Sequence, residues 1–188
     1  MIEKCADVIV DWLIKSDVVE EDDKELYCYA IYSLVLSISP LLLAIGFGLC
    51  MGCVSQSIVV VLPFVIIRKY SGGYHTKHLW SCLVCSSLLL FLCITASFYV
   101  KCGWLLAIFT IGATVSLIYF SPIDNENRVL SKDEKIQYKK ITAILVFVIL
   151  FADILLFWLE RYTYSVCISI GIMLSAGLQL PCILEKKK

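Results

Sequence analysis

The stretch Arg-Lys-Tyr-Ser-Gly-Gly-Tyr-His-Thr-Lys-His-Leu-Trp-Ser-Cys, from Arg68 to Cys82, is a short polar segment between two strongly apolar runs. It contains both histidines of the chain, His75 and His78, and its last residue, Cys82, already lies in the next apolar run. A histidine and a thiol held near each other at a membrane surface would permit chemistry with a cysteine nucleophile. Residues 68–78 are called the polar island below.

The composition is that of a membrane protein. Of the 188 residues, 60% are hydrophobic, and the mean hydropathy is +0.88, whereas soluble domains are nearer half apolar. A spanning helix needs about 20 apolar residues, so the length allows several spans and no large soluble domain. The formal net charge is zero, which gives no electrostatic reason to expect nucleic acid as a partner. The ten cysteines lie mostly in apolar runs, which favours small buried side chains over a disulfide scaffold.

The apolar runs predict an all-α integral membrane protein with six transmembrane helices. These fall at residues 30–48, 53–67, 79–100, 104–121, 141–159 and 164–184. The second is short, because some 15 residues rise only about 22 Å against a hydrocarbon core of about 30 Å.

The N-terminus differs from the rest of the chain. Residues 2–16 place Ile2, Cys5, Ile9, Trp12 and Leu13 at helical spacing among charged residues, which predicts an amphipathic helix. It is expected to lie on the bilayer surface or against the membrane domain, and it does not have the pattern of a signal peptide. We therefore expect a cytoplasmic or interfacial N-terminal helix at residues 1–26 and a six-span domain at residues 27–188.

Lysine and arginine define an orientation. With six crossings, fourteen of the sixteen basic residues fall on one side, which positive-inside statistics place in the cytoplasm. Both termini, the polar island and the long loop at residues 122–140 are then expected on the cytoplasmic side of the cell membrane.

The polar island carries the candidate chemistry. In one continuous helix, His75 and Cys82 would lie about 10 Å apart along the axis, too far for a nucleophile–base contact of about 2.6–3.2 Å. Gly72 and Gly73 permit unusual backbone angles, so the chain can fold His75 back over the helix start. The positive helix end would favour a Cys82 thiolate, and the pair would be that of a cysteine peptidase.

Other interpretations of the same residues are simpler. Cys82 can be an ordinary membrane-helix cysteine, with His75 and His78 as interfacial polar residues. His75-x-x-His78 before Cys82-x-x-Cys85 resembles zinc spacing, but Cys85 lies a full turn deeper and no second shell is evident. We therefore expect neither a metal nor a cofactor.

Two motifs in this topology resemble one protein family. Arg68, Gly72-Gly73, His75 and Cys82 lie between the second and third spans, and Ser-Pro-Ile-Asp-Asn-Glu-Asn-Arg-Val-Leu at residues 121–130 follows the fourth. This arrangement resembles the accessory gene regulator protein B family, bacterial membrane cysteine endopeptidases of quorum sensing. The second motif is similar to the family pattern small-Pro-x-Asp-x-x-Asn, with Ser121 where alanine is common. The resemblance covers nearly the whole chain.

The resemblance implies a reaction. The partner would be a small precursor peptide with an amphipathic helix, a central segment that contains a cysteine, and an acidic C-terminal tail. Cys82 would cleave off the tail through an acyl-enzyme, with His75 as base and then acid. The precursor cysteine would close a thiolactone ring to give an autoinducing peptide. Membrane lipid would surround the enzyme, and it could form a homodimer.

The supporting residues and the rival functions are less defined. Asp124 and Glu126 lie on the expected cytoplasmic side and are candidates to orient His75. Arg68 could bind the acidic tail or anchor a helix end at the headgroups. Asp153 lies about 18 Å deep in the fifth span and is expected to pack there, away from Cys82. A small peptide transporter or exporter and a non-enzymatic membrane scaffold remain alternatives.

Overall fold

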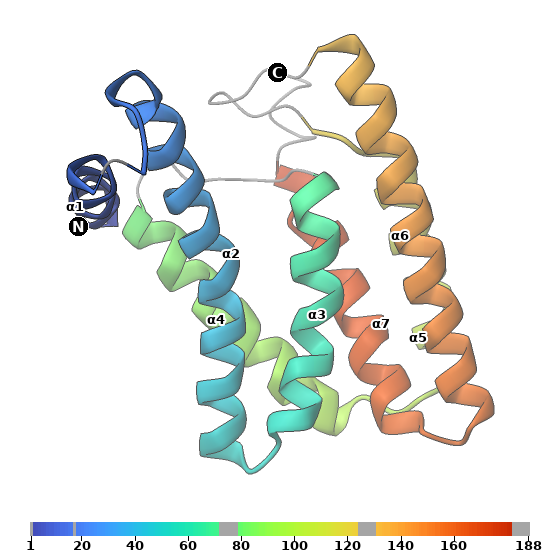
Figure 1. Cartoon of the computed structure of the whole chain (residues 1–188). Coiled ribbons are helices and arrows are strands. Elements are labelled where there is room, and N and C mark those ends of the chain that lie inside the picture. Colours follow the sequence, from blue (N-terminus) through green and yellow to red (C-terminus); the bar gives the residue numbers. More distant parts are fainter. Residues whose placement is uncertain (1, 17, 72–78, 124–130, 182–188) are drawn as a thin grey trace. The chain divides into compact units, whose positions relative to one another are not determined.

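The computed structural model describes residues 2–16, 18–71, 79–123 and 131–181, and within these ranges the chain is helical without strands (Figure 1). This confirms the all-α prediction. The elements are α1 (Ile2–Lys15), the 3-10 helix η1 (Glu21–Asp23), α2 (Lys24–Met51), α3 (Val54–Ser71), α4 (Leu79–Tyr99), α5 (Trp104–Phe120), α6 (Lys132–Trp158) and α7 (Tyr162–Gly177).

Each of the six predicted spans coincides with one of the helices α2 to α7. In the described residues, Val54–Ser71 and Asp133–Trp158 are long and apolar enough to cross a membrane. The other apolar helical segments are shorter: Ile38–Met51, Cys85–Tyr99, Trp104–Phe120 and Tyr162–Gly177. The six-span arrangement itself stays a prediction.

The sequence-based limits of two helices were wrong. Helix α3 continues past Ile67 to Ser71 and has 18 residues, so it rises about 27 Å. Arg68 and Lys69, assigned above to the polar island, form its last turn. Apolar runs end at the first charge, but lysine and arginine are good helix formers whose long side chains reach from a membrane helix toward water.

Helix α6 begins at Lys132, inside the loop predicted at residues 122–140. The side chain of Ser131 accepts a hydrogen bond from the Glu134 N–H at 3.3 Å, and Glu134 Oε2 accepts one from the Ser131 N–H at 2.9 Å. This capping box satisfies two backbone donors that the first turn leaves without helical partners. The polar start of α6 is therefore specified locally, before any apolar residue is reached.

The chain divides into two compact units, Met1–Ser39 and Pro40–Lys188. The division falls inside α2 at Pro40, which lacks a backbone N–H. The domain division expected between residues 26 and 27 stays a prediction.

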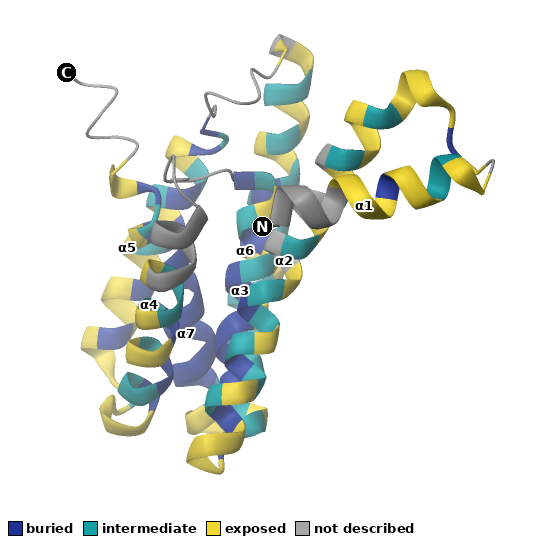
Figure 2. Cartoon of the chain, turned by 90° about the vertical axis from the view of Figure 1, so that its left-hand side faces the viewer, coloured by how far each residue is buried: buried dark blue, intermediate teal, exposed yellow. Residues whose placement is uncertain are grey.

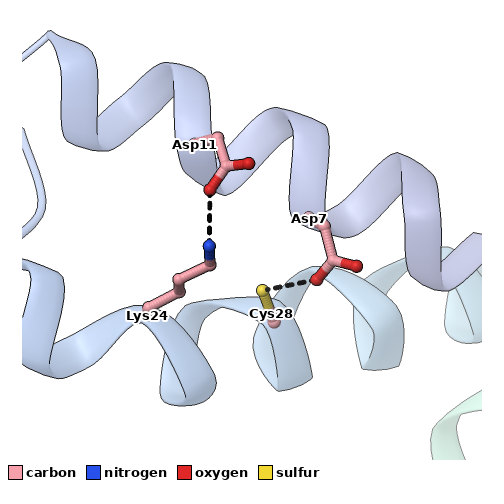
Figure 3. Close-up of polar contacts among 4 residues, drawn as sticks. All are labelled: Asp7, Asp11, Lys24 and Cys28. Atoms are coloured by element: carbon pink, nitrogen blue, oxygen red, sulfur yellow. Dashed lines mark hydrogen bonds and ion pairs between the residues drawn. The ribbon is translucent and has the colours of Figure 1, made fainter.

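In the first unit, α1 packs on the first turns of α2 through its acidic face (Figure 3). Lys24 Nζ lies 2.7 Å from Asp11 Oδ1, and the Cys28 thiol donates to Asp7 Oδ1 at 3.4 Å. Val8, Ile9 and Trp12 remain exposed on α1. The predicted amphipathic helix is present, and in this unit its apolar residues Ile9 and Trp12 are exposed.

Helix α7 lies at the centre of the second unit. It contacts α3, α4, α5 and α6, and eleven of its sixteen residues are buried (Figure 2). Gly171 permits the closest approach, because a Cβ at this position would overlap the Val60 carbonyl oxygen of α3 and lie 3.1 Å from the Pro63 side chain. Figure 1 shows α3 and α7 side by side.

Asp153 joins α6 to α7. Its carboxylate accepts hydrogen bonds from Ser165 Oγ at 2.5 Å and Ser169 Oγ at 2.8 Å, and all three side chains are buried. A buried acid in a membrane helix needs such partners. The contacts agree with the packing role expected for Asp153.

Candidate active site

The described residues include only part of the predicted site. Arg68 belongs to the last turn of α3. Gly72, Gly73 and His75 lie in residues 72–78, and Asp124 and Glu126 lie in residues 124–130, all outside the described residues. The pairing of His75 with Cys82 and the fold-back at the two glycines therefore stay predictions.

Cys82 is the fourth residue of α4, which starts at Leu79 as predicted. Its backbone is helical, whereas its side chain lies outside the described part of the chain. The fourth residue lies about 4.5 Å along the helix from the first. It belongs to the first turn of the helix, at the end where the helix dipole favours negative charge.

A backbone hydrogen bond joins the residues that directly precede the two undescribed motif segments. The Ile123 N–H donates to the Ser71 carbonyl oxygen at 3.0 Å. Ser71 is the last residue of α3 and directly precedes Gly72, and Ile123 directly precedes Asp124. The segments that carry His75 and Asp124 therefore begin next to each other.

Gln179 reinforces this junction from just beyond the end of a third helix, α7. It lies two residues beyond the end of α7, and its side chain is completely buried. Gln179 Nε2 donates to Ser121 Oγ at 2.9 Å and to the Ser71 carbonyl oxygen at 3.4 Å. The sequence analysis did not identify Gln179. The available signal was an amide in an otherwise apolar predicted span.

An aromatic contact extends the junction to α6. The rings of Tyr70 and Tyr138 meet edge to face, with centroids 5.9 Å apart. Tyr70 precedes Ser71 in α3, and Tyr138 lies near the start of α6. Parts of four helices thus meet where residues 72–78 and 124–130 begin.

Arg68 lies half-buried at the same end of α3. Its guanidinium carbon is 5.4 Å from the centre of the Phe64 ring, one turn earlier. A guanidinium stacked on an aromatic ring keeps its charge while its motion is restricted. Arg68 therefore presents a partly ordered positive charge one turn before the polar island continues past Ser71.

Asp153 is remote from this junction. Its partner Ser169 lies ten residues before Gln179 along the chain, a separation of about 15 Å along a helix. Asp153 is therefore separate from the junction, whereas its separation from Cys82 and His75 stays a prediction.

In the described ranges, no group of three or more histidine, cysteine or acidic residues could hold a metal ion. Both histidines of the chain lie outside those ranges. The expectation that the site uses no metal therefore stays a prediction.

Comparisons with known proteins give a consistent result. The family model for accessory gene regulator B matches residues 6–181. AgrB-like protein 2 of Clostridium perfringens strain 13 is 25% identical over 147 residues, 72% of this chain and 67% of the relative. An AgrB-like protein of C. perfringens strain SM101 is 24% identical over 197 residues, 97% of this chain and 90% of the relative. No solved structure matches the chain.

Proposed function

The chain belongs to the membrane-associated accessory gene regulator B family, and we propose that it is a cysteine endopeptidase that processes a quorum-sensing precursor peptide. Cys82 is the nucleophile and His75 is the general base. The enzyme removes the C-terminal tail of the precursor and promotes thiolactone closure. The product is the autoinducing peptide.

The observation that carries this proposal is the hydrogen bond between the Ile123 N–H and the Ser71 carbonyl. Consecutive Cα atoms are about 3.8 Å apart, so the Cα atom of His75 can be at most about 15 Å from that of Ser71. Asp124 follows Ile123 directly. The chain can therefore place Asp124 and His75 in contact without unfolding any described helix, and Glu126 is two residues further along.

The proposed first step breaks a peptide bond. The Cys82 thiol transfers its proton to His75 and attacks the carbonyl carbon at the end of the central segment. His75 then gives the proton to the departing amine, and the acyl group remains on Cys82 as a thioester. An orienting carboxylate, which we assign to Asp124 with Glu126 as the second choice, stabilises the imidazolium.

The second step exchanges one thioester for another. The precursor's cysteine thiol attacks the acyl carbon, Cys82 leaves and regains a proton, and the ring closes without consuming water. The number and type of thioester bonds are unchanged, so the acyl group stays activated. Cys82 in the first turn of α4 suits this step, because a site just inside the bilayer excludes water that would hydrolyse the thioester.

Arg68 is proposed to bind the acidic tail of the precursor. Its guanidinium is held over Phe64, and it belongs to the same helix end from which the polar island continues. A positive charge there would attract acidic residues that follow the scissile bond.

We propose a six-span topology with both termini and this site in the cytoplasm of a bacterial cell membrane. The basic residues support it, as does the meeting of the C-terminal ends of α3 and α5 with the segment after α7. Alternate spans of a multi-pass protein must end on the same side. Association into a homodimer is a further part of the proposal.

The deciding experiment follows the mass of the precursor. The full chain and its precursor are co-expressed, with Cys82→Ala, His75→Ala and Cys85→Ala as variants. We expect tail loss and a cyclic product with the unmodified chain and with Cys85→Ala, and uncleaved precursor with the other two. Tail loss with Cys82→Ala would contradict the proposal. Export of intact precursor, with no change in mass, would favour a transporter instead.

A further inference from the structure

We propose that Gln179 is a positioning residue of this site: its side-chain amide holds the end of α3 against the end of α5 and so sets the relative placement of the segments that carry His75 and Asp124. The inference rests on the proposed function. It adds a residue from the sixth predicted span, which neither motif contains.

The contacts of Gln179 define what it holds. One nitrogen, Nε2, donates to Ser121 Oγ at 2.9 Å and to the Ser71 carbonyl oxygen at 3.4 Å. The same Ser71 oxygen accepts the Ile123 N–H at 3.0 Å. The Ser71 carbonyl oxygen therefore accepts two hydrogen bonds, one from Gln179 beyond the end of α7 and one from Ile123 beyond the end of α5. All four residues are buried, so the contacts exclude competing water.

The position of the junction relates it to catalysis. Residue 72 begins one peptide bond after Ser71, and residue 124 one peptide bond after Ile123. A shift of α3 against α5 would displace the start of one segment relative to the start of the other by the same distance. Misplacement of a catalytic group by 1 Å can reduce rate about 100-fold. A residue that fixes this junction therefore affects the rate of the chemical step.

The second amide atom argues against a purely packing role. Gln179 Oε1 is buried, and no described residue donates a hydrogen bond to it. A buried carbonyl without a donor is destabilising, whereas an apolar side chain of similar length would be buried without that loss. For the free energy of unfolding alone, an apolar side chain would therefore be better than the amide at this position. Local departures from the most stable choice are expected at functional sites.

Helix α7, which Gln179 follows, offers a matched control. Ser175 lies one turn before Gln179, is also buried, and donates to the Gly171 carbonyl oxygen of its own helix at 2.9 Å. It binds neither Ser71 nor Ser121 in the described contacts. Ser175→Ala removes a buried polar group from α7 without changing the junction.

The test uses the full chain in lipid nanodiscs with its precursor peptide. Gln179→Met keeps the length of the side chain and removes the donor, and we expect kcat to fall about 100-fold with little change in KM. Ser121→Ala removes one acceptor, and we expect a several-fold fall in kcat. The double variant should be no worse than Gln179→Met alone, because both changes remove the same hydrogen bond.

A second readout separates positioning from stability. Alkylation of Cys82 by iodoacetamide, measured on its peptide by mass spectrometry across pH, reports how well His75 stabilises the thiolate. We expect Gln179→Met to move the midpoint to higher pH, and Ser175→Ala to leave it and kcat unchanged. Unchanged kcat in Gln179→Met would overturn the inference, as would equal loss in Ser175→Ala. Failure of the proposed function appears separately, as cleavage that survives Cys82→Ala.

Discussion

The Ser71 carbonyl oxygen accepts the Ile123 N–H at 3.0 Å, and this bond connects the two sequence motifs that lie far apart along the chain. One motif continues from the end of α3, and the other from the end of α5. Without this contact, the polar island and the segment at residues 121–130 would be two separate loops. With it, the two segments start next to each other, and Gln179, beyond the end of α7, binds both Ser71 and Ser121 there.

The proposed topology can be tested with native cysteines. Cys102 lies in the turn between α4 and α5, on the predicted outer side, and Cys28 lies before the predicted first span, on the inner side. Intact cells treated with a membrane-impermeant maleimide should show labelled Cys102 and unlabelled Cys28. Permeabilised cells should label both, Cys28 more slowly than Cys102 unless the pH is raised, because the raised pKa of Cys28 keeps its thiol neutral. Labelling of Cys28 in intact cells would mean that the proposed orientation is inverted or that the chain has fewer spans than proposed.

Sequence patterns were sufficient for the all-α class and for the start of α4 at Leu79. They set the end of α3 too early, because apolarity was taken as the limit of a helix that Arg68 and Lys69 extend. The start of α6 was also missed, although Ser131 and Glu134 form a capping box that the sequence contains. Local signals of helix formation thus outweighed hydropathy at the end of α3 and at the start of α6.

Gln179 could not be identified in the same way. Its role depends on the rotation of α7 and on the heights at which α3 and α5 end, which together place Ser71 and Ser121 within reach of one amide. No local sequence pattern predicts how these three helices are placed relative to one another. Asp153 was easier, because an acid within an apolar run requires a partner wherever it lies.

Gly171→Ala should destabilise the second unit. The added methyl group would overlap the Val60 carbonyl oxygen, which is backbone and cannot rotate away, so α7 must move from α3. Overpacking of this kind reduces the free energy of unfolding by about 1–3 kcal/mol. Thermal unfolding in detergent micelles, followed by circular dichroism, measures the change.

Gly112→Ala is the control for that prediction. Gly112 lies inside α5, and a Cβ there meets nothing within 4 Å. Alanine in a helix interior is favoured over glycine by about 0.5–1 kcal/mol, so this variant should unfold at the same or a slightly higher temperature. Equal destabilisation by both substitutions would show that close approach at Gly171 is not the cause.

Asp153→Leu should destabilise the α6–α7 contact without changing the chemistry. The substitution leaves the buried hydroxyls of Ser165 and Ser169 without their carboxylate acceptor. Loss of such partners reduces the free energy of unfolding by about 1–3 kcal/mol. Asp153→Asn keeps one acceptor oxygen and should be milder. Precursor cleavage measured well below the unfolding temperature should keep its kcat in both variants.

The opposite pattern for Asp153 has a clear meaning. If Asp153→Asn abolishes cleavage while the unfolding temperature is unchanged, the carboxylate takes part in the reaction, and the separation of Asp153 from the junction is not maintained during catalysis. Combining Asp153→Leu with Gln179→Met should give additive effects on unfolding, because the two side chains share no partner in the described contacts.

The thiol of Cys28 should be alkylated more slowly than an unperturbed thiol, and its reaction should need a higher pH. Burial raises the pKa of Cys28, and its hydrogen bond to the Asp7 carboxylate raises that pKa further. A raised pKa favours the neutral thiol, so the stabilising contact is fully present below the ordinary thiol pKa. The contact is lost as pH rises through the folded-state pKa. The alkylation rate of Cys28 as a function of pH measures that transition.

Asp7→Asn removes the charge that faces Cys28 and should lower the pH midpoint of its alkylation, although burial keeps the pKa above its ordinary value. Asp22→Asn is the matched control, since Asp22 is an exposed acid of η1. It should leave the Cys28 profile unchanged. The Lys24 pKa is raised by its hydrogen bond to Asp11, so deprotonation of Lys24 breaks this second contact as pH rises through that pKa. Equal midpoints in Asp7→Asn and the unmodified chain would mean that α1 does not hold its acidic face against α2 in solution.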